Sequence, residues 1–554
     1  MLNALTAHDG PGVVLLTGFN GVDALELVLA WRRMQRAQGR DPFVVVPSRG
    51  EALDLTRRLA EEEGVILGGP AVGTVDDVVT ACLGSQAQWV PPLVREAFVY
   101  EAGLPLWGRE GSVLGRLQRP LPALVDLMEE FEESGLDDHQ IRDALAAWAA
   151  GTRWETARTL AGELSLIVSG YGRLCRETGV ESRSRRVRLA ALQYGGGGGH
   201  VARPVGVGLW DSGDIDGRQW NRPLACCGFL TFTPAQQRFL QAVARSVPVV
   251  VESGWDGSYA TEFMGAEVGR WLDGGAVHVP RSQAEVAGEA SATAGVEYRL
   301  LKSSGRRGEL ETAVAEVVHL MREGLSPSRV MFVARRVGPW RRMALGVCAR
   351  YGVPLALDAP MRLGETRLGH ALLRGLREEL TGKRAAMPEE IDLHACVSGT
   401  GSGSRLVPGA VSEATRQLRR LWVTGAPESV QVEAWDVRAA EAVCGAMQAM
   451  CDWGLLMGAH ELGEPGRQGA LSGLSAGALL DFLAETRLRA AVDPVDALSL
   501  VSATRMRLRR PEVAFVLGLV DQEFPEAEGA RGLLSARLRR DCNRCAGVRL
   551  VDEA

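Results

Sequence analysis

Short apolar runs alternate with segments of helical apolar spacing through the first part of the chain. Residues 13–16 and 42–47 have the pattern of buried strands, and residues 65–67 have the pattern of a third. Helical spacing follows the first two strands, over residues 24–34 and 51–63. This alternation predicts a parallel sheet with ligand-facing loops at the carboxyl ends of its strands.

The pattern becomes helical almost throughout from residue 86 to residue 192. Long i, i+3, i+4 apolar spacing covers residues 114–133 and 156–177, which predicts a helical insertion into the α/β unit. Near the end of this region, residues 182–188 form a basic cluster, SRSRRVR. Two interpretations of the cluster remain open: a solvated helix face, or a patch that contacts phosphate groups.

A second α/β pattern follows the helical region. Residues 274–295 are polar and rich in small residues, which predicts a linker. Before it, strands are expected at residues 205–209, 224–229 and 247–251, with Thr233 and Pro234 starting a helix between the last two. After it, helices are expected at residues 309–324 and 335–351, and strands at residues 329–334, 353–357, 498–502 and 513–519. Residues 385–488 are mostly helical in pattern, so we expect an α/β protein with two parallel-sheet domains that each carry a helical insertion.

Composition limits the class of protein. A chain of 554 residues is too long for one core, and a content of 46% apolar and 23% charged residues is ordinary for a folded domain protein. The net charge of −6 gives no overall attraction to nucleic acid, so any DNA contact has to come from local basic patches. The sequence has no secretory signal pattern and no apolar run of membrane-spanning length, so we expect a cytoplasmic protein.

The cysteines carry no clear chemical signal. Ten of them are scattered along the chain, which does not indicate a disulfide framework. Cys542 and Cys545 form a lone C-x-x-C motif without a second pair nearby, and we interpret this motif as structural rather than metal-binding.

The turn after the first strand has the setting of a phosphate-binding loop without its chemical groups. Gly18 and Gly21 lie between a strand and a helix, as in G-x-x-x-x-G-K-[ST]. Aligned on Gly18, the motif places Asp23 at the second glycine, Ala24 at the phosphate-binding lysine and Leu25 at the metal-binding hydroxyl. The loop therefore either binds no phosphate or has lost the groups that did.

Lysine is almost absent from this chain. Among 62 basic residues only Lys302 and Lys383 are lysines. Gly382 precedes Lys383, but Arg384 follows it and Arg377 stands where the first glycine of a phosphate loop is needed. The positions two residues before the lysines are Leu300 and Thr381. A phosphate-loop lysine and a nuclease site of the D…[DE]-x-K type are therefore both excluded.

Three segments together resemble the motor region of superfamily 1 (UvrD/PcrA-like) DNA helicases. The longest is LVSATRMRLRRPEVAFVLGLVDQEFP at residues 500–525, which keeps the family's strand, loop, strand and F-[IV]-x-G-[LM]…F-P ending. GFLTFTPAQ at residues 228–236 and YGVP at residues 351–354 are also typical of the family. Within that group the chain is most similar to the AddB-type subunits of AddAB helicase/nuclease complexes, from residue 13 to its end.

The resemblance implies two RecA-like domains in the 1A/1B/2A/2B layout of superfamily 1. The implied boundaries are 1–85 and 201–273 for domain 1A, 86–200 for insertion 1B, 274–295 for a linker, 296–384 and 493–554 for domain 2A, which is incomplete, and 385–492 for insertion 2B. The family's nuclease domain, its iron–sulfur cysteines and its last arginine-bearing motif do not occur in these residues. We therefore expect the helicase-like portion alone, without an iron–sulfur cluster.

The departures from the family pattern concern ATP chemistry. In the family's D-E-x-Q-D-T-x-P-A-Q segment, two carboxylates hold Mg²⁺ and polarise the attacking water. Alignment on residues 234–236 puts Cys227 and Gly228 at those carboxylate positions. Arg335 matches the family's phosphate-facing arginine, but one arginine cannot hydrolyse ATP. We expect no catalytic residue and no required cofactor, with ATP and Mg²⁺ relevant only if the degenerate site is still used.

The same resemblance implies a role in handling DNA. The positions that match DNA-backbone contacts in active relatives are Ser48, Arg49, Thr74, Ser502, Thr504 and Arg505. Hydroxyls and arginine suit contact with phosphate without base readout, although a hydroxyl such as that of Thr74 can equally cap a helix. The expected partners are single-stranded DNA or a duplex end and an AddA-like helicase/nuclease subunit.

Three functions remain open from the sequence. The first is a non-catalytic, helicase-like DNA-binding subunit of a double-strand-break repair complex, which guides single-stranded DNA beside an active helicase. The second is a subunit that shares in ATP-dependent helicase and exodeoxyribonuclease activity. The third is an unrelated nucleotide-binding enzyme of the Rossmann type, against which the absence of G-x-G-x-x-G after the first strand counts.

Overall fold

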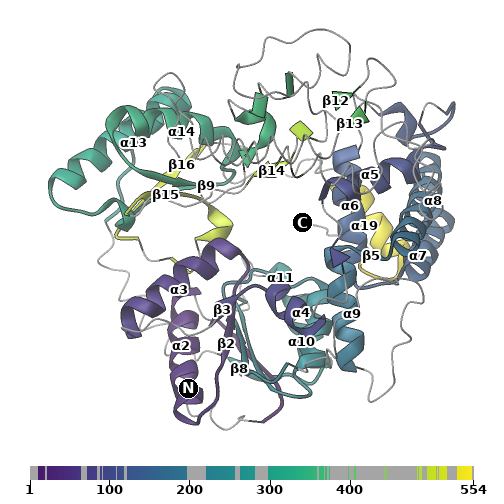
Figure 1. The fold of residues 1–554 in the computed structure, drawn as a ribbon, viewed down its shortest axis with the longest axis horizontal. Helices are drawn as coiled ribbons and strands as arrows, with labels where there is room; N and C mark the ends of the chain where they lie inside the picture. Colours follow the sequence, from purple (N-terminus) through teal and green to yellow (C-terminus); the bar gives the residue numbers. More distant parts are fainter. Residues whose placement is uncertain are drawn as a thin grey trace.

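The computed structural model shows two all-parallel sheets and a helical unit (Figure 1). The residues that it describes are 10–18, 21–63, 71–83, 88–89, 92–107, 109–117, 121–195, 220–255, 262–280, 297–357, 361–366, 369–370, 373–374, 397–398, 405–406, 439, 442, 445, 483–484, 486–488, 496–506, 508–509, 511–520 and 533–551. The α/β class expected from the alternating pattern is confirmed.

The larger sheet has six parallel strands in the order β3-β2-β6-β7-β1-β8. We call it the first sheet. Its strands are β1 (Gly12–Thr17), β2 (Phe43–Val45), β3 (Val72–Gly73), β6 (Leu224–Cys226), β7 (Pro248–Ser253) and β8 (Val277–Pro280). Its helices are α2 (Gly21–Ala37), α3 (Arg49–Glu63), α4 (Val75–Leu83), α10 (Pro234–Val243) and α11 (Glu262–Asp273). The expected strands at 65–67 and 205–209 lie outside the described residues.

Both faces of the first sheet are covered, which explains its continuous apolar strands. In β1, Val14 and Leu16 face a core formed with α2 and α3. Val13 and Leu15 face the opposite core, formed with α4, α10 and α11. Because side chains alternate between the faces of a strand, a run in which every position is apolar fits this three-layer arrangement.

Strand β8 differs from the expected linker at residues 274–295. Residues 277–280 pair in parallel with β1 and form the edge of the first sheet. Exposed positions along the strand gave it a polar, linker-like pattern, since Val277 and His278 both face solvent on this edge. Residues 281–296 lie outside the described residues.

The smaller sheet has four parallel strands in the order β10-β15-β9-β16, and we call it the second sheet. Its strands are β9 (Val330–Ala334), β10 (Leu355–Leu357), β15 (Leu498–Ser502) and β16 (Val513–Leu517). Helices α13 (Gly305–Arg322) and α14 (Gly338–Tyr351) pack on one of its faces, and the short helices η5 (Pro327–Arg329) and η10 (Ala503–Arg505) flank its strands. All four strands fall where the sequence pattern predicts them.

The region expected to be the second helical insertion is described only in small pieces. They include β11 (Met361–Arg362), η6 (Leu363–Glu365), β12 (Val397–Ser398), β13 (Arg405–Leu406) and β14 (Arg487–Leu488). Strand β11 pairs with β14 and β12 pairs with β13, both antiparallel. The expectation that residues 385–488 are mostly helical therefore falls largely outside the described residues.

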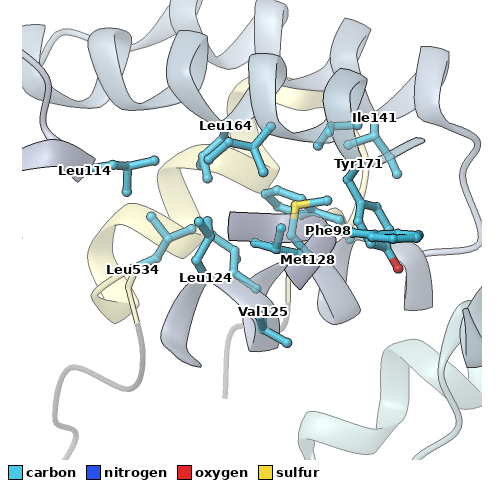
Figure 2. Packing of buried hydrophobic residues seen from close by; sticks show 14 of the residues in the cluster. Phe98, Leu114, Leu124, Val125, Met128, Ile141, Leu164, Tyr171 and Leu534 are labelled. Atoms are coloured by element: carbon cyan, nitrogen blue, oxygen red, sulfur yellow. The ribbon is translucent and has the colours of Figure 1, made fainter. Parts of the chain in front are cut away.

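The helical unit packs α5, α6, α7, α8 and the C-terminal helix α19 around one apolar core (Figure 2), whereas Val187 and Ala190 of α9 pack in a core of the first sheet. Its elements are α5 (Pro92–Gly103), η2 (Leu114–Arg116), α6 (Leu121–Glu133), α7 (Asp138–Gly151), α8 (Glu155–Thr178), α9 (Arg183–Gly195) and α19 (Ala536–Ala546), with the short parallel pair β4 (Gln88–Trp89) and β5 (Val180–Glu181). This confirms the mostly helical character expected for residues 86–192.

The C-terminal helix α19 lies in the helical unit rather than beside the second sheet. Sequence order placed residues 493–554 in the second α/β domain. In the structure, Trp148 Nε1 and Thr152 Oγ1 of the α7 region both donate to Asp541 Oδ2 of α19, at 3.1 and 2.8 Å. Cys542 is fully buried in the helical core, and its burial raises the pKa of its thiol to about 12. The packing supports the structural interpretation of this cysteine.

Glu267 of α11 is a buried acid beside the first sheet, with 3% of its surface exposed. It accepts hydrogen bonds from Phe232 N–H at 3.0 Å and from Trp271 Nε1 at 3.4 Å. Burial raises the pKa of Glu267 to about 7, against the lowering effect of these hydrogen bonds. The folded state therefore holds a proton on this residue that the unfolded chain has already released near neutral pH.

The raised pKa of Glu267 predicts a pH-dependent loss of stability. Because the folded form binds the proton more tightly, the contribution of Glu267 falls as the pH rises from about 4.5 to about 7, by about 3 kcal/mol. Glu267→Gln keeps an acceptor for Phe232 and removes the titration. We expect urea denaturation to show that the free energy of unfolding of Glu267→Gln, relative to that of the parent protein, increases as the pH rises across this range. Parallel stability curves for the two proteins would contradict the assignment.

Candidate functional site

The carboxyl edge of the first sheet brings together the two degenerate nucleotide segments. The loop at Gly18 follows β1, and Cys227 and Gly228 follow β6. Strand β7 lies between these two strands, so its last residues lie between the two segments. The sequence-based expectation that both segments belong to one site of a parallel sheet agrees with this geometry, since loops at neighbouring carboxyl ends converge.

Protein groups already use the polar backbone at this edge. Gly18 adopts a positive φ of 81° and its N–H donates to the carbonyl of Trp255 at 2.7 Å. The N–H of Cys227 donates to the carbonyl of Val45 at 3.0 Å. A phosphate loop holds its ligand through backbone N–H groups that point at the phosphates. These two N–H groups are directed at the protein itself.

The positions of the missing lysine and hydroxyl are part of the core. Ala24 and Leu25 are 0% and 1% exposed and pack with β1 and α3. In the functional motif, side chains at these two positions reach the phosphates and the metal. Here they form the inner face of α2, so the helix is anchored by apolar packing. Nothing is described for the side chain of Asp23, and Gly21 is the first residue of α2.

Glu252 is a carboxylate at this edge that sequence reasoning missed. It lies at the end of β7, is fully buried, and accepts a hydrogen bond from Gly228 N–H at 2.9 Å. In the β1–β7 register it is paired with Leu16, one residue before Thr17. The signal was present in the sequence, because an acidic residue directly follows the apolar run of β7. Thr17 Oγ1 in turn lies 2.8 Å from His278 Nε2 of β8, a second contact that the sequence did not indicate.

Two proposed DNA-contacting hydroxyls of the first sheet lie at helix starts. Ser48 Oγ donates to Glu51 Oε2 at 2.8 Å and accepts from Glu51 N–H at 3.2 Å, which caps α3. Thr74 Oγ1 donates to Asp77 Oδ2 at 2.9 Å at the start of α4. Since β2 and β3 are neighbours, Ser48 and Thr74 follow adjacent strands, and Arg49 beside Ser48 is exposed. The Ser48 hydroxyl thus makes the contact of a helix cap, whereas the Thr74 hydroxyl donates to a carboxylate of α4.

The proposed residues of the second sheet gather after β15. Ser502 Oγ and Thr504 Oγ1 lie 2.9 Å apart, Thr504 is exposed, and Arg505 is half-buried at the end of η10. Arg335 follows β9, the neighbour of β15, and is also half-buried. All four residues therefore lie at the carboxyl edge of the second sheet.

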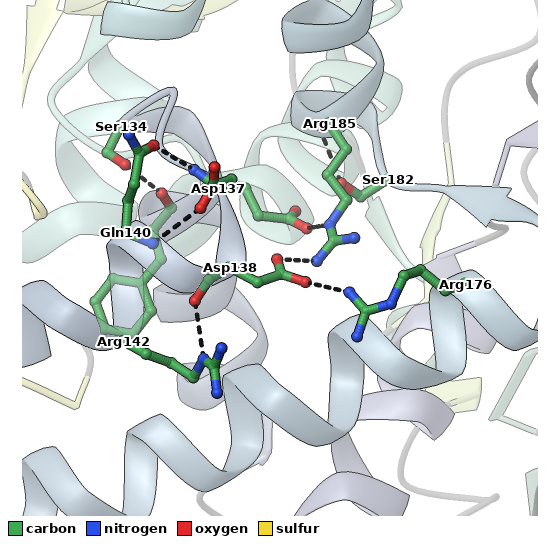
Figure 3. Close-up of polar contacts among 10 residues, drawn as sticks. Ser134, Asp137, Asp138, Gln140, Arg142, Arg176, Ser182 and Arg185 are labelled. Carbon is green, nitrogen blue, oxygen red and sulfur yellow. Dashed lines mark hydrogen bonds and ion pairs between the residues drawn. The ribbon is translucent and has the colours of Figure 1, made fainter. Parts of the chain in front are cut away.

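Arginines of the basic cluster at residues 182–188 pair with carboxylates of other helices. Arg185 is 8% exposed, and its Nε lies 2.8 Å from Glu132 Oε1 of α6, while its guanidinium also pairs with Asp138 of α7 (Figure 3). Arg176 of α8 completes the network at 2.9 Å from Asp138 Oδ2. Arg183 pairs with Asp76 of α4 at 2.7 Å, which links the helical unit to the first sheet. The solvated-face interpretation was wrong for Arg185 and Arg186, which are buried. The carboxylate partners of Arg185 come from helices distant in sequence.

The described residues contain no group of three or more His, Cys, Asp or Glu side chains placed to hold a metal ion. Within the same residues, no helix is long and apolar enough to cross a lipid bilayer. Comparison with protein-family models gives no match, and comparison with curated proteins gives none either.

Proposed function

We propose that this chain is a helicase-like DNA-binding subunit with a degenerate ATP site, in the RecA-like 1A/1B/2A/2B layout of superfamily 1. Its role is to guide single-stranded DNA in an AddAB-type double-strand-break repair complex, beside an active AddA-like helicase. The observation that carries the proposal is the contrast between the positions for ATP chemistry and the positions for DNA contact at the carboxyl edges of the sheets. The ATP-chemistry positions of the first sheet are filled by apolar core, whereas the DNA-contact positions keep hydroxyls and arginines.

The core packing of Ala24 and Leu25 supports the loss of ATP chemistry. Transfer of the γ-phosphoryl group depends on positioned positive charge and metal, and their removal costs orders of magnitude in rate. Glu252 does not replace the missing pair, because it is fully buried and accepts the N–H of Gly228. We therefore expect no Mg-ATP affinity and no strand separation by this chain alone.

The retained residues support contact with the DNA backbone. Arg49 and Arg505 follow strands of the two different sheets, and each lies next to hydroxyl groups. Contacts of this type position a strand through its phosphates and carry no base specificity. The acidic net charge makes such local arginines the source of any affinity.

A salt series of single-stranded DNA binding tests the proposal. We expect fluorescence anisotropy with a labelled oligonucleotide to show affinity that falls with salt, and Arg49→Ala and Arg505→Ala each to lower the slope of log K against log salt by about 0.7. Arg173→Ala is the matched control, since Arg173 is an exposed arginine on α8 of the helical unit. An undetectable interaction at low salt, or equal slopes in all three variants, would refute the DNA role. Tight Mg-ATP binding by titration calorimetry would refute the loss of the ATP site.

A further inference from the structure

The segment between β15 and β16 connects the cores of the two sheets. Met506 packs with Met331 and Val333 on the second sheet. Two residues later, Leu508 packs against the core that α2 and α3 form with the first sheet. A turn brings this about, since Arg509 N–H donates to the carbonyl of Met506 at 3.0 Å. In Figure 1 the yellow segment that follows β15 lies next to α3. Met506, Leu508 and Arg509 therefore form a bridge between the sheets.

Gly228 provides the surface on which Leu508 rests. A Cβ atom at residue 228 would lie 2.7 Å from both Cγ and Cδ1 of Leu508, closer than real Cβ contacts occur. Gly228 also has a φ of +79°, which L-residues with a side chain rarely adopt. The close approach thus requires glycine at the position where an active helicase-like site would carry a carboxylate. The substitution that removes the acid also makes room for the leucine.

An ion pair adds a second contact beside the first. Arg509 Nη2 lies 2.8 Å from Asp54 Oδ2 of α3, and the side chain of Arg509 is only 15% exposed. A largely buried arginine in a contact between two units contributes packing as well as charge. Together, Leu508 on Gly228 and Arg509 on Asp54 form two adjacent anchors on the first sheet.

We infer that residues 508 and 509 hold the second sheet against the first without any nucleotide. The bridge ends at the carboxyl edge of the first sheet, on the residue next to Cys227. In a nucleotide-driven machine, a ligand at such an edge links two α/β units and its hydrolysis releases them. Here direct side-chain contact makes that link. This inference concerns the chain's own conformation and stands whether or not the chain binds DNA.

Hydrogen exchange on the full chain tests the bridge. We expect Leu508→Ala and Arg509→Glu to speed exchange in peptides covering residues 226–230 and α3 by about tenfold, because opening there becomes easier. The charge-swapped variant Asp54→Arg with Arg509→Asp should recover protection. Arg342→Glu, an exposed arginine of α14, is the matched control and should leave these peptides unchanged. Peptides of α7 and α8 report on global unfolding in the same experiment.

Two outcomes would overturn the inference. One is that the bridge variants behave like the parent: hydrogen exchange in Arg509→Glu and Leu508→Ala proceeds at the parent rate, or the charge swap does not recover protection. The other is slower exchange at residues 226–230 of the parent protein when Mg-ATP is added, which would show that nucleotide makes the link. Loss of DNA binding in the salt series leaves both readouts unchanged, so failure of the DNA role and failure of the bridge are distinguishable.

Discussion

Replacing Ala24 by lysine should destabilise the protein and give no affinity for ATP. The substitution restores the residue type of a phosphate loop at its aligned position. In the structure, however, Ala24 is fully buried among Val14, Leu16 and Val28. A buried ammonium without a partner costs several kcal/mol, and its place in the first turn of α2 adds repulsion from the helix dipole. We expect the free energy of unfolding to fall by about 4 kcal/mol.

The measurement is urea denaturation together with Mg-ATP titration of the same variant. Ala37→Lys is the control, because Ala37 is exposed at the end of α2, where a cation suits the dipole. It should change stability by no more than about 0.5 kcal/mol. If Ala24→Lys is as stable as the parent, or gains affinity for Mg-ATP, then the position faces a usable phosphate site and the core assignment fails.

Replacing Arg185 by methionine should destabilise the helical unit strongly. Arg185 and Glu132 are 8% and 5% exposed, and Arg185 also pairs with Asp138. Although burial disfavours the charged guanidinium, the two carboxylates raise the pKa of Arg185 above its ordinary value. Methionine would remove the largest compensating charge from the buried Glu132, whose other partners include Ser182 and Arg95. Breaking a buried pair in this way costs about 3–5 kcal/mol.

A double variant separates the charge effect from lost packing. When Glu132→Met is combined with Arg185→Met, apolar groups fill the space of the pair, and we expect most of the lost stability to return. Arg173→Met is the control: Arg173 pairs with Glu177 at 3.8 Å on the exposed face of α8, where an ion pair contributes less than about 1 kcal/mol. Thermal or urea unfolding gives the free energy of unfolding of the parent protein, Arg185→Met, the double variant and Arg173→Met. A loss for Arg185→Met no larger than for Arg173→Met would contradict the network.

The sequence predicted all four strands of the second sheet. The fully buried β9 and the strands β10, β15 and β16 fall at the expected residues, as does the start of α10, where Thr233 and Gln236 form a capping box. These features depend on side chains within a few residues of one another. The edge strand β8 was missed, because its four residues include only two apolar positions, Val277 and Val279, within a segment of small and polar residues.

Contacts between distant segments could not be predicted in this way. Three contacts join residues that are far apart in sequence. Arg185 pairs with its carboxylates, α19 packs on α7, and Leu508 packs on Gly228. A single sequence records which residues are charged or apolar, but not which helices face each other. The same holds for the candidate site. Its degenerate positions could be identified from the sequence, whereas the role of Glu252 and the bridge could not.

By itself, the sequence determined the α/β class and the absence of a phosphate-loop lysine, because residue identities and local periodicity settle both. Only the tertiary structure decided what replaces the missing chemistry. Ala24 and Leu25 are core residues, the N–H of Gly18 is used by Trp255, and Leu508 lies on Gly228. These outcomes follow from packing density and hydrogen-bond satisfaction in the folded chain, which depend on how the two sheets meet.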